Sequence, residues 1–81
     1  MQTGRVLTEA EKDVLAFERS WWELRASKDA AIRSRFGTGT AAYYRTLNIL
    51  LDRPEALAHD PLLVRRLRRL RAARLARRRS A

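Results

Sequence analysis

The sequence contains no cysteine and a single histidine, so it offers no disulfide framework, no thiolate zinc site and no cluster of histidine ligands. No apolar run approaches the roughly 20 residues that a membrane-spanning helix needs. Residues 1–7 lack the apolar stretch of a signal peptide. We therefore expect a cytoplasmic protein that uses no metal or other cofactor and is not embedded in a membrane.

Patterns typical of catalytic sites are also lacking. His59 has no serine partner at a recognisable spacing. The acidic residues near the start are accounted for by a helix cap and a helix exterior; they are Glu9, Glu11, Asp13 and Glu18. The segment Gly37–Thr40 has neither the preceding strand nor the lysine of a phosphate-binding loop. These absences predict that the protein is not an enzyme.

Hydrophobic residues recur at spacings of three and four and predict helices without strands. The first helix should cover about 9–25, with Thr8 and Glu11 as its capping box. Its apolar face comprises Ala10, Val14, Phe17, Trp21 and Leu24. Leu15 and Trp22 lie about 100° around the helix and form a second apolar edge. This edge belongs to the core, or contacts the C-terminal helix, or joins two subunits in a homodimer. The C-terminal helix is the alternative interface for such a homodimer.

Capping residues mark the other helices. Ser27 and Gly37 bracket a helix over about 28–36, the next runs from Thr40 to about Leu51, and Pro54–Leu57 forms one short turn. Asp60 and Pro61 open the last helix, whose apolar face is Leu63, Leu67 and Leu70. Beyond Arg74 this pattern fades, so we expect Arg77, Arg78 and Arg79 to be frayed.

These elements predict an all-α fold: a small helical bundle containing a helix-turn-helix, followed by an Arg-rich C-terminal helix. The expected organisation is a flexible N-terminus over 1–7, a helix-turn-helix domain over 8–60, and a basic helix and tail over 61–81.

Charge is distributed unevenly. Through residue 60, nine basic residues are balanced by nine acidic ones, whereas the segment from Arg65 to Arg79 holds nine arginines and no acid. The net charge of +9 therefore resides in the C-terminal segment. Clustered arginines bind phosphates well, because the guanidinium matches phosphate geometry and releases counterions from DNA.

Two short helices joined by Gly37-Thr38-Gly39-Thr40 are typical of a helix-turn-helix, whose second helix enters the DNA major groove. On that helix, Arg45 can recognise guanine and Asn48 adenine, and their spacing of three places them on one face. We predict base contacts from Thr40, Tyr44, Arg45 and Asn48. We predict phosphate contacts from Ser27, Lys28, Thr38, Tyr43, Arg65, Arg66, Arg68, Arg69 and Arg71.

Other interpretations fit the same residues. The two helices can be ordinary members of a bundle, with Arg45 and Asn48 merely solvated. The basic C-terminal helix can instead bind an acidic protein partner, RNA or an anionic membrane surface.

Several motifs together resemble a family of small actinobacterial proteins with a helix-turn-helix and a basic C-terminus. The similarity covers about residues 7–72; it rests on Leu7-Thr8-Glu9, Phe17-Glu18, Trp21-Trp22, Tyr43-Tyr44, Leu47-Asn48, Asp52–Leu57, Asp60-Pro61 and the Arg/Leu pattern of 65–71. The resemblance implies a DNA-binding, nucleoid-associated protein or transcriptional regulator, with Tyr43, Tyr44 and Asn48 in its recognition helix. The expected partner is double-stranded DNA, and the expected location is the nucleoid.

Overall fold

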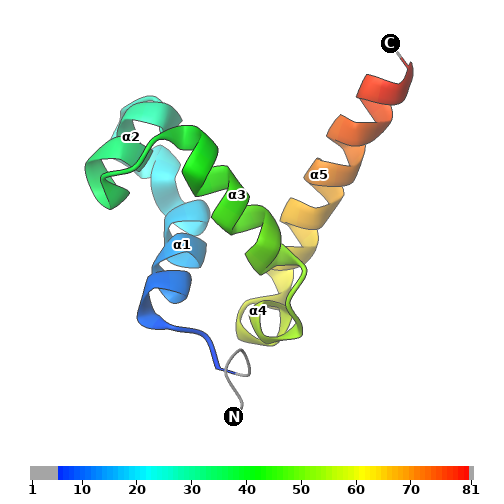
Figure 1. Cartoon of the computed structure of the whole chain (residues 1–81), viewed down its shortest axis with the longest axis horizontal. Coiled ribbons are helices and arrows are strands. Elements are labelled where there is room, and N and C mark those ends of the chain that lie inside the picture. The colour runs from blue at the N-terminus through cyan, green and yellow to red at the C-terminus, as the bar shows by residue number, and fades with distance from the viewer. Residues whose placement is uncertain (1–5, 81) are drawn as a thin grey trace.

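The computed structural model describes residues 6–80, and within this range it is built from helices and contains no strand (Figure 1). The elements, in chain order, are α1 (Glu9–Ser20), the 3-10 helix η1 (Trp21–Leu24), α2 (Lys28–Phe36), α3 (Thr40–Leu51), α4 (Pro54–His59) and α5 (Pro61–Ser80). The predicted all-α bundle is confirmed. None of these helices has both the length and the apolar character needed to cross a membrane.

The predicted helix caps are present. The Thr8 hydroxyl accepts a hydrogen bond from the Glu11 amide at 3.1 Å, and the Glu11 carboxylate accepts one from the Thr8 amide at 2.8 Å. The Ser27 hydroxyl accepts the Ala30 amide and caps α2. Gly37 ends α2 in the left-handed conformation, with φ 68°. These local interactions fix the ends of α1 and α2.

The first helix is shorter than predicted. α1 ends at Ser20, not near residue 25, and η1 packs against both α1 and α2. Arg25 then adopts a left-handed conformation, with φ 56°, which turns the chain toward α2. This early break leaves Trp22 and Leu24 exposed, so Leu24 does not join the apolar face assigned to it. Ala10 is exposed as well.

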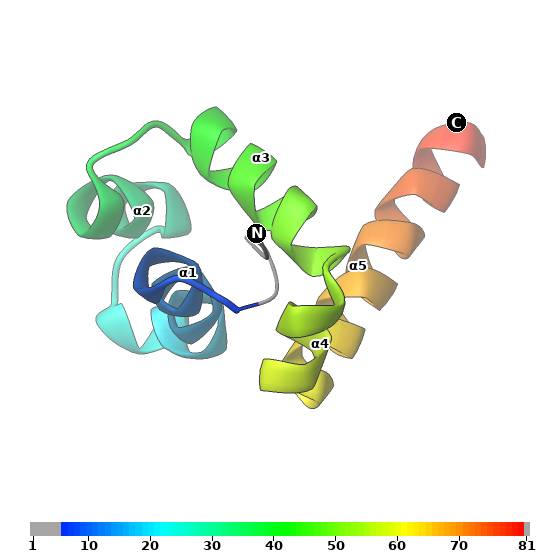
Figure 2. The ribbon, with the colours of Figure 1, turned by 60° about the horizontal axis from the view of Figure 1, so that its bottom comes forward.

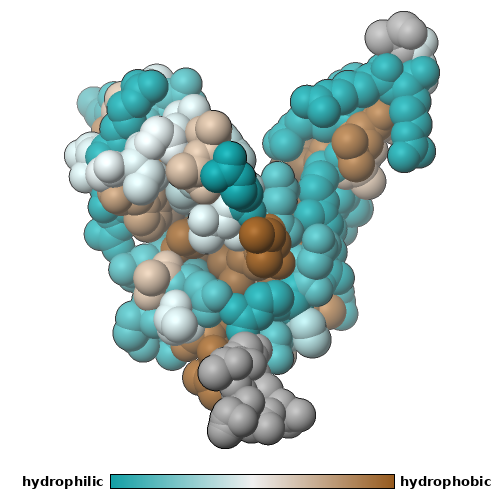
Figure 3. Space-filling view, in the orientation of Figure 1, coloured by the Kyte–Doolittle hydropathy of each residue, from teal (hydrophilic) through white to brown (hydrophobic). Residues whose placement is uncertain are grey.

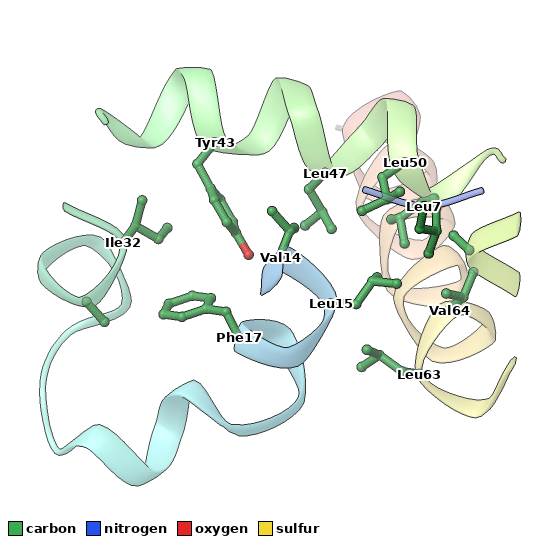
Figure 4. Close-up of a cluster of buried hydrophobic side chains, with 13 residues drawn as sticks. Leu7, Val14, Leu15, Phe17, Ile32, Tyr43, Leu47, Leu50, Leu63 and Val64 are labelled. Carbon is green, nitrogen blue, oxygen red and sulfur yellow. The ribbon is translucent and has the colours of Figure 1, made fainter. Parts of the chain in front are cut away.

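The core gathers side chains from α1, α2, α3, α4 and α5 (Figure 4). Leu15 is 1 % exposed and packs in this core. Of the alternatives for the Leu15/Trp22 edge, Leu15 follows the first and belongs to the core, whereas Trp22 is exposed. Leu7 is buried too, so the predicted flexible N-terminus does not include it, while residues 1–5 of that segment lie outside the described range. The last residue of the predicted tail, residue 81, also lies outside that range.

The C-terminal helix α5 packs against the bundle over its first turns and projects into solvent over its second half. Leu63 and Val64 are buried in the shared core, so the start of α5 folds as part of the bundle. Residues 72–80 are all exposed and remain helical to Ser80, so the predicted fraying of Arg77, Arg78 and Arg79 is wrong. Arginine, alanine and leucine are good helix formers, which accounts for this continuation. Nine residues at 1.5 Å each give a projecting arm of about 14 Å.

The arm gives the molecule a V shape, with α1, α2 and α3 in one limb and α5 in the other (Figures 1 and 2). Because α5 diverges from α3, Leu67 is half-buried and Leu70 is largely exposed. The predicted apolar face of α5 is thus buried at one end only.

Candidate nucleic-acid interface

The turn between α2 and α3 consists of Gly37, Thr38 and Gly39. Thr38 is exposed, and Thr40, the first residue of α3, is half-buried. Gly39 occupies the N-cap position of α3 and brings no side chain to cap it. The first amides of α3 are therefore not capped from this position, unlike those of α1 and α2.

Two of the predicted base-reading residues lie on the exposed face of α3. Arg45 and Asn48 are exposed, and neither side chain makes a hydrogen bond or ion pair to another residue within 6–80. Ile49 lies on the same side of the helix and is 64 % exposed. Tyr44 is half-buried, with its ring edge-to-face against Tyr43. The accessible polar groups of this face are those of Arg45 and Asn48.

Tyr43 points into the protein instead (Figure 4). Its side chain is 3 % exposed, and its hydroxyl donates to Oε2 of Glu18 at 2.5 Å. The prediction that Tyr43 contacts a DNA phosphate is therefore wrong, because the phenol is enclosed and engaged. Burial, together with the hydrogen bond to Glu18, raises the pKa of Tyr43.

Glu18 is buried as well, not on the exterior as predicted. Its Oε1 accepts a hydrogen bond from Nζ of Lys28 at 3.0 Å, so each of the two carboxylate oxygens has a donor. The Lys28 ammonium also lies 5.4 Å from the Trp21 ring centroid and 5.2 Å from that of Tyr44. Lys28, predicted to hold a phosphate, is thus committed to an internal ion pair, while Ser27 remains exposed beside it.

Two arginines of α5 hold the end of α3. Nε of Arg68 donates to the Leu51 carbonyl at 2.7 Å, and Nη2 of Arg71 donates to Oδ1 of Asp52 at 2.6 Å. Arg71 also reaches the Asn48 carbonyl at 3.3 Å. These contacts satisfy carbonyls at the negative end of α3, where cations are favoured. Both residues were predicted as phosphate contacts, but their guanidinium groups already have partners.

The other seven arginines of α5 have no hydrogen-bonding or ion-pair partner within residues 6–80. They are Arg65, Arg66, Arg69, Arg74, Arg77, Arg78 and Arg79, and all are exposed. Arg65, Arg66 and Arg69 belong to the predicted phosphate-binding set. The structure thus divides the basic helix into two arginines with a structural role and seven that are available to an anion.

Two ion pairs connect α5 to the rest of the bundle: Arg19 with Asp60 just before its first residue, and Arg71 of α5 with Asp52. Arg19 of α1 donates to both carboxylate oxygens of Asp60, which also accepts the Leu63 amide at 3.4 Å. Burial on its own would raise the pKa of Asp60, but the Arg19 and Leu63 hydrogen bonds outweigh it and the pKa is lowered. The hydrogen bond from Arg71 lowers the pKa of Asp52 in the same way.

An open groove of about 730 Å³ lies between α3 and α5, with η1 and Lys28 also in its walls; we call it the α3–α5 groove. Asn48 of α3 and Arg66 and Arg74 of α5 all line it. Figure 3 shows the hollow at the top of the V and the hydrophilic surface of the α5 limb. One residue of the exposed face of α3, Asn48, and two of the seven arginines, Arg66 and Arg74, therefore line the same groove.

Sequence reasoning missed the inward orientation of Glu18. A signal was present, because Glu18 follows Val14 by four residues and precedes Trp21 by three, which places it on the apolar face. Nothing comparable distinguishes Arg68 and Arg71 from the arginines around them, because their partners lie on α3, which only the tertiary fold brings near.

A family model described as "Protein of unknown function (DUF3263)" matches residues 6–79, so the chain belongs to this family. Searches of the curated proteins and of the solved structures gave no match.

Proposed function

We propose that this member of the DUF3263 family binds double-stranded DNA and acts in the nucleoid, as a nucleoid-associated protein or a transcriptional regulator. In this proposal, α2, the glycine-containing turn and α3 are a helix-turn-helix, and α3 enters the major groove. Arg45 and Asn48 read base edges, since each has a side chain able to bond bidentately to one purine.

One observation carries the proposal: the α3–α5 groove is lined by both Asn48 and Arg74. A ligand contacting the exposed face of α3 would thus lie beside the unpaired arginines of α5. A duplex presents bases and phosphates together in this way. The arm of about 14 Å matches roughly four phosphate steps of one strand, at 3.4 Å each along the axis.

The turn provides a second supporting feature. Because Gly39 brings no side chain to cap α3, the first amides of that helix can donate hydrogen bonds to a backbone phosphate, as can the exposed hydroxyl of Thr38. This arrangement would position α3 by phosphate contacts while Arg45 and Asn48 read the sequence.

Selection from a random duplex pool, followed by fluorescence anisotropy on the enriched and scrambled duplexes, tests the proposal. We expect enrichment of a short motif and an affinity that falls steeply with salt. Equal affinity for a duplex of any sequence, for RNA and for heparin would contradict motif reading. Absence of duplex binding near physiological salt would reject the proposed function altogether.

A further inference from the structure

The α3–α5 groove has an apolar floor that DNA binding does not require. Trp21, Leu47 and Leu51 line it from the bundle, and Leu67 lines it from α5. At its margin Trp22 is 52 % exposed and Leu70 is 47 % exposed. Indole and leucine side chains left in water beside an open groove are typical of protein-binding surfaces.

The apolar surface continues past Trp22. Trp22 also lines a second hollow of about 300 Å³, together with Leu62 and Arg66. Leu62 is 77 % exposed. Trp22 is therefore central to an exposed apolar strip that runs from Leu62 to Leu70. The charged phosphates of a duplex offer no apolar counterpart to such a strip.

The charge around the groove is positive. Arg66 and Arg74 line it with no ion-pair partner within residues 6–80, whereas Arg71 and Lys28, also in the lining, are paired with Asp52 and Glu18. Glu18 is the single carboxylate in the lining, and its side chain is 2 % exposed and bound to Tyr43 and Lys28. An acidic ligand in the groove would therefore be attracted by its arginines and would meet no accessible carboxylate to repel it. A second copy of α5, which has nine arginines and no acid, would be repelled.

The dimensions suit a helix. From Arg66 to Arg74 the wall formed by α5 is about 12 Å long, or roughly two helical turns. A helix of that length presents apolar anchors at positions i, i+3 or i+4, and i+7. We propose that the α3–α5 groove is a docking site for an acidic amphipathic helix of a partner protein, with Trp22 as the central contact. This inference does not depend on DNA binding, but because Asn48 and Arg74 line the same groove, such a helix would compete with a duplex for it.

The test uses a fluorescein-labelled synthetic helix of about 16 residues, without tryptophan, with leucines at i, i+3, i+4 and i+7 and glutamates elsewhere. A scrambled peptide of the same composition keeps the charge and removes the apolar face. We expect the first peptide to bind and to shift the emission of the protein's two tryptophans to the blue. The scrambled peptide should bind at least about tenfold more weakly.

Matched variants locate the site. Trp22→Ala should weaken peptide binding by about tenfold or more, as expected for a central aromatic contact. Leu24→Ala is the control, because Leu24 is similarly exposed but lines a different hollow. Trp22 lines the same groove as Asn48 and Arg74, but the proposed duplex contacts come from those polar side chains. Trp22→Ala should therefore weaken duplex binding much less than peptide binding.

Three results would overturn the inference. Equal binding of the ordered and scrambled peptides would mean that charge alone attracts them, and absence of binding at about 1 mM would mean that the groove accepts no such helix. Loss of duplex affinity in Trp22→Ala equal to the loss of peptide affinity would assign the apolar floor of the groove to DNA. An equal blue shift with anionic phosphatidylglycerol vesicles would assign it to a membrane surface.

Discussion

The hydroxyl of Tyr43 on α3 donates a hydrogen bond of 2.5 Å to the carboxylate of Glu18 on α1, and both residues are 3 % exposed. Lys28 of α2 completes the arrangement by pairing with the other oxygen of Glu18. Three helices are thus joined at one buried carboxylate. Burial of a charge is costly unless it is paired and hydrogen-bonded, so each of these partners is needed.

The first prediction concerns the Tyr43 hydroxyl. Tyr43→Phe should lower the free energy of unfolding by about 1–3 kcal/mol, because one oxygen of the buried Glu18 loses its donor. The measurement is urea denaturation followed by circular dichroism. Tyr44→Phe is the matched control, since the Tyr44 hydroxyl has no hydrogen-bonding partner within residues 6–80. Equal stability of the two variants would show that the Glu18 contact contributes nothing.

The second prediction concerns pH and Asp60. Because its pKa is lowered in the folded state, Asp60 adds stability above its usual pKa, and this stability is lost as the pH falls through the folded value. Asp60→Asn keeps a residue able to cap α5 but removes the ion pair with Arg19. We expect this variant to be less stable than the wild type at pH 7 and to approach it below about pH 4.

Urea denaturation at intervals from neutral pH to about pH 2.5 measures this difference. Glu23→Gln is the control, because Glu23 is exposed and has no partner within residues 6–80. Its stability difference from the wild type should stay nearly constant with pH. If the Asp60→Asn difference were also constant, the Arg19 pair would have no part in the acid sensitivity.

The fold was predictable to the extent that local interactions determine it. The hydrogen bonds of the Thr8/Glu11 box, the Ser27 cap and the Gly37 C-cap each join residues no more than four positions apart. Each of these signals marks its helix boundary correctly. α1 was predicted too long because its apolar spacing continues through Trp21 and Leu24. Packing of η1 against α2 decides where α1 stops, and that contact is not encoded in the spacing.

The candidate site was predictable in part for the same reason. Arg45 and Asn48 were placed on an exposed face by their spacing alone, and the structure finds them there. Tyr43 was predicted to contact a phosphate, and a side chain enclosed against Glu18 cannot do so. Arg68 and Arg71 differ from their neighbours only through α3 residues about 20 positions earlier, so the helical pattern could not separate them.

The third prediction concerns base reading. Arg45→Ala and Asn48→Ala should each weaken binding to the preferred duplex by about 1–3 kcal/mol and leave binding to a scrambled duplex nearly unchanged. Anisotropy titrations on both duplexes measure the two affinities. Arg33→Ala of α2 serves as a charge control, because Arg33 is exposed and unpaired within residues 6–80 but lies outside α3. Equal losses on both duplexes would show that Arg45 and Asn48 do not read bases.

The last prediction concerns the two kinds of arginine in α5. Replacing Arg69, Arg74, Arg77 and Arg78 with glutamine removes four unpaired charges while retaining good helix formers. If these residues neutralise four phosphates, the slope of log K against log salt should become less steep by about 3–4. The ranking of duplex sequences should not change, because phosphate contacts carry no sequence information.

Arg68→Gln with Arg71→Gln is the matched comparison, since it removes charge from the same helix at positions that hold α3. We expect it to lower thermal stability, because the Leu51 carbonyl and Asp52 lose their donors. Its salt slope should change by less than about 1. If the fourfold variant kept the wild-type slope, the arm would not contact DNA. If both variants flattened the slope equally per charge removed, the division between structural and available arginines would be wrong.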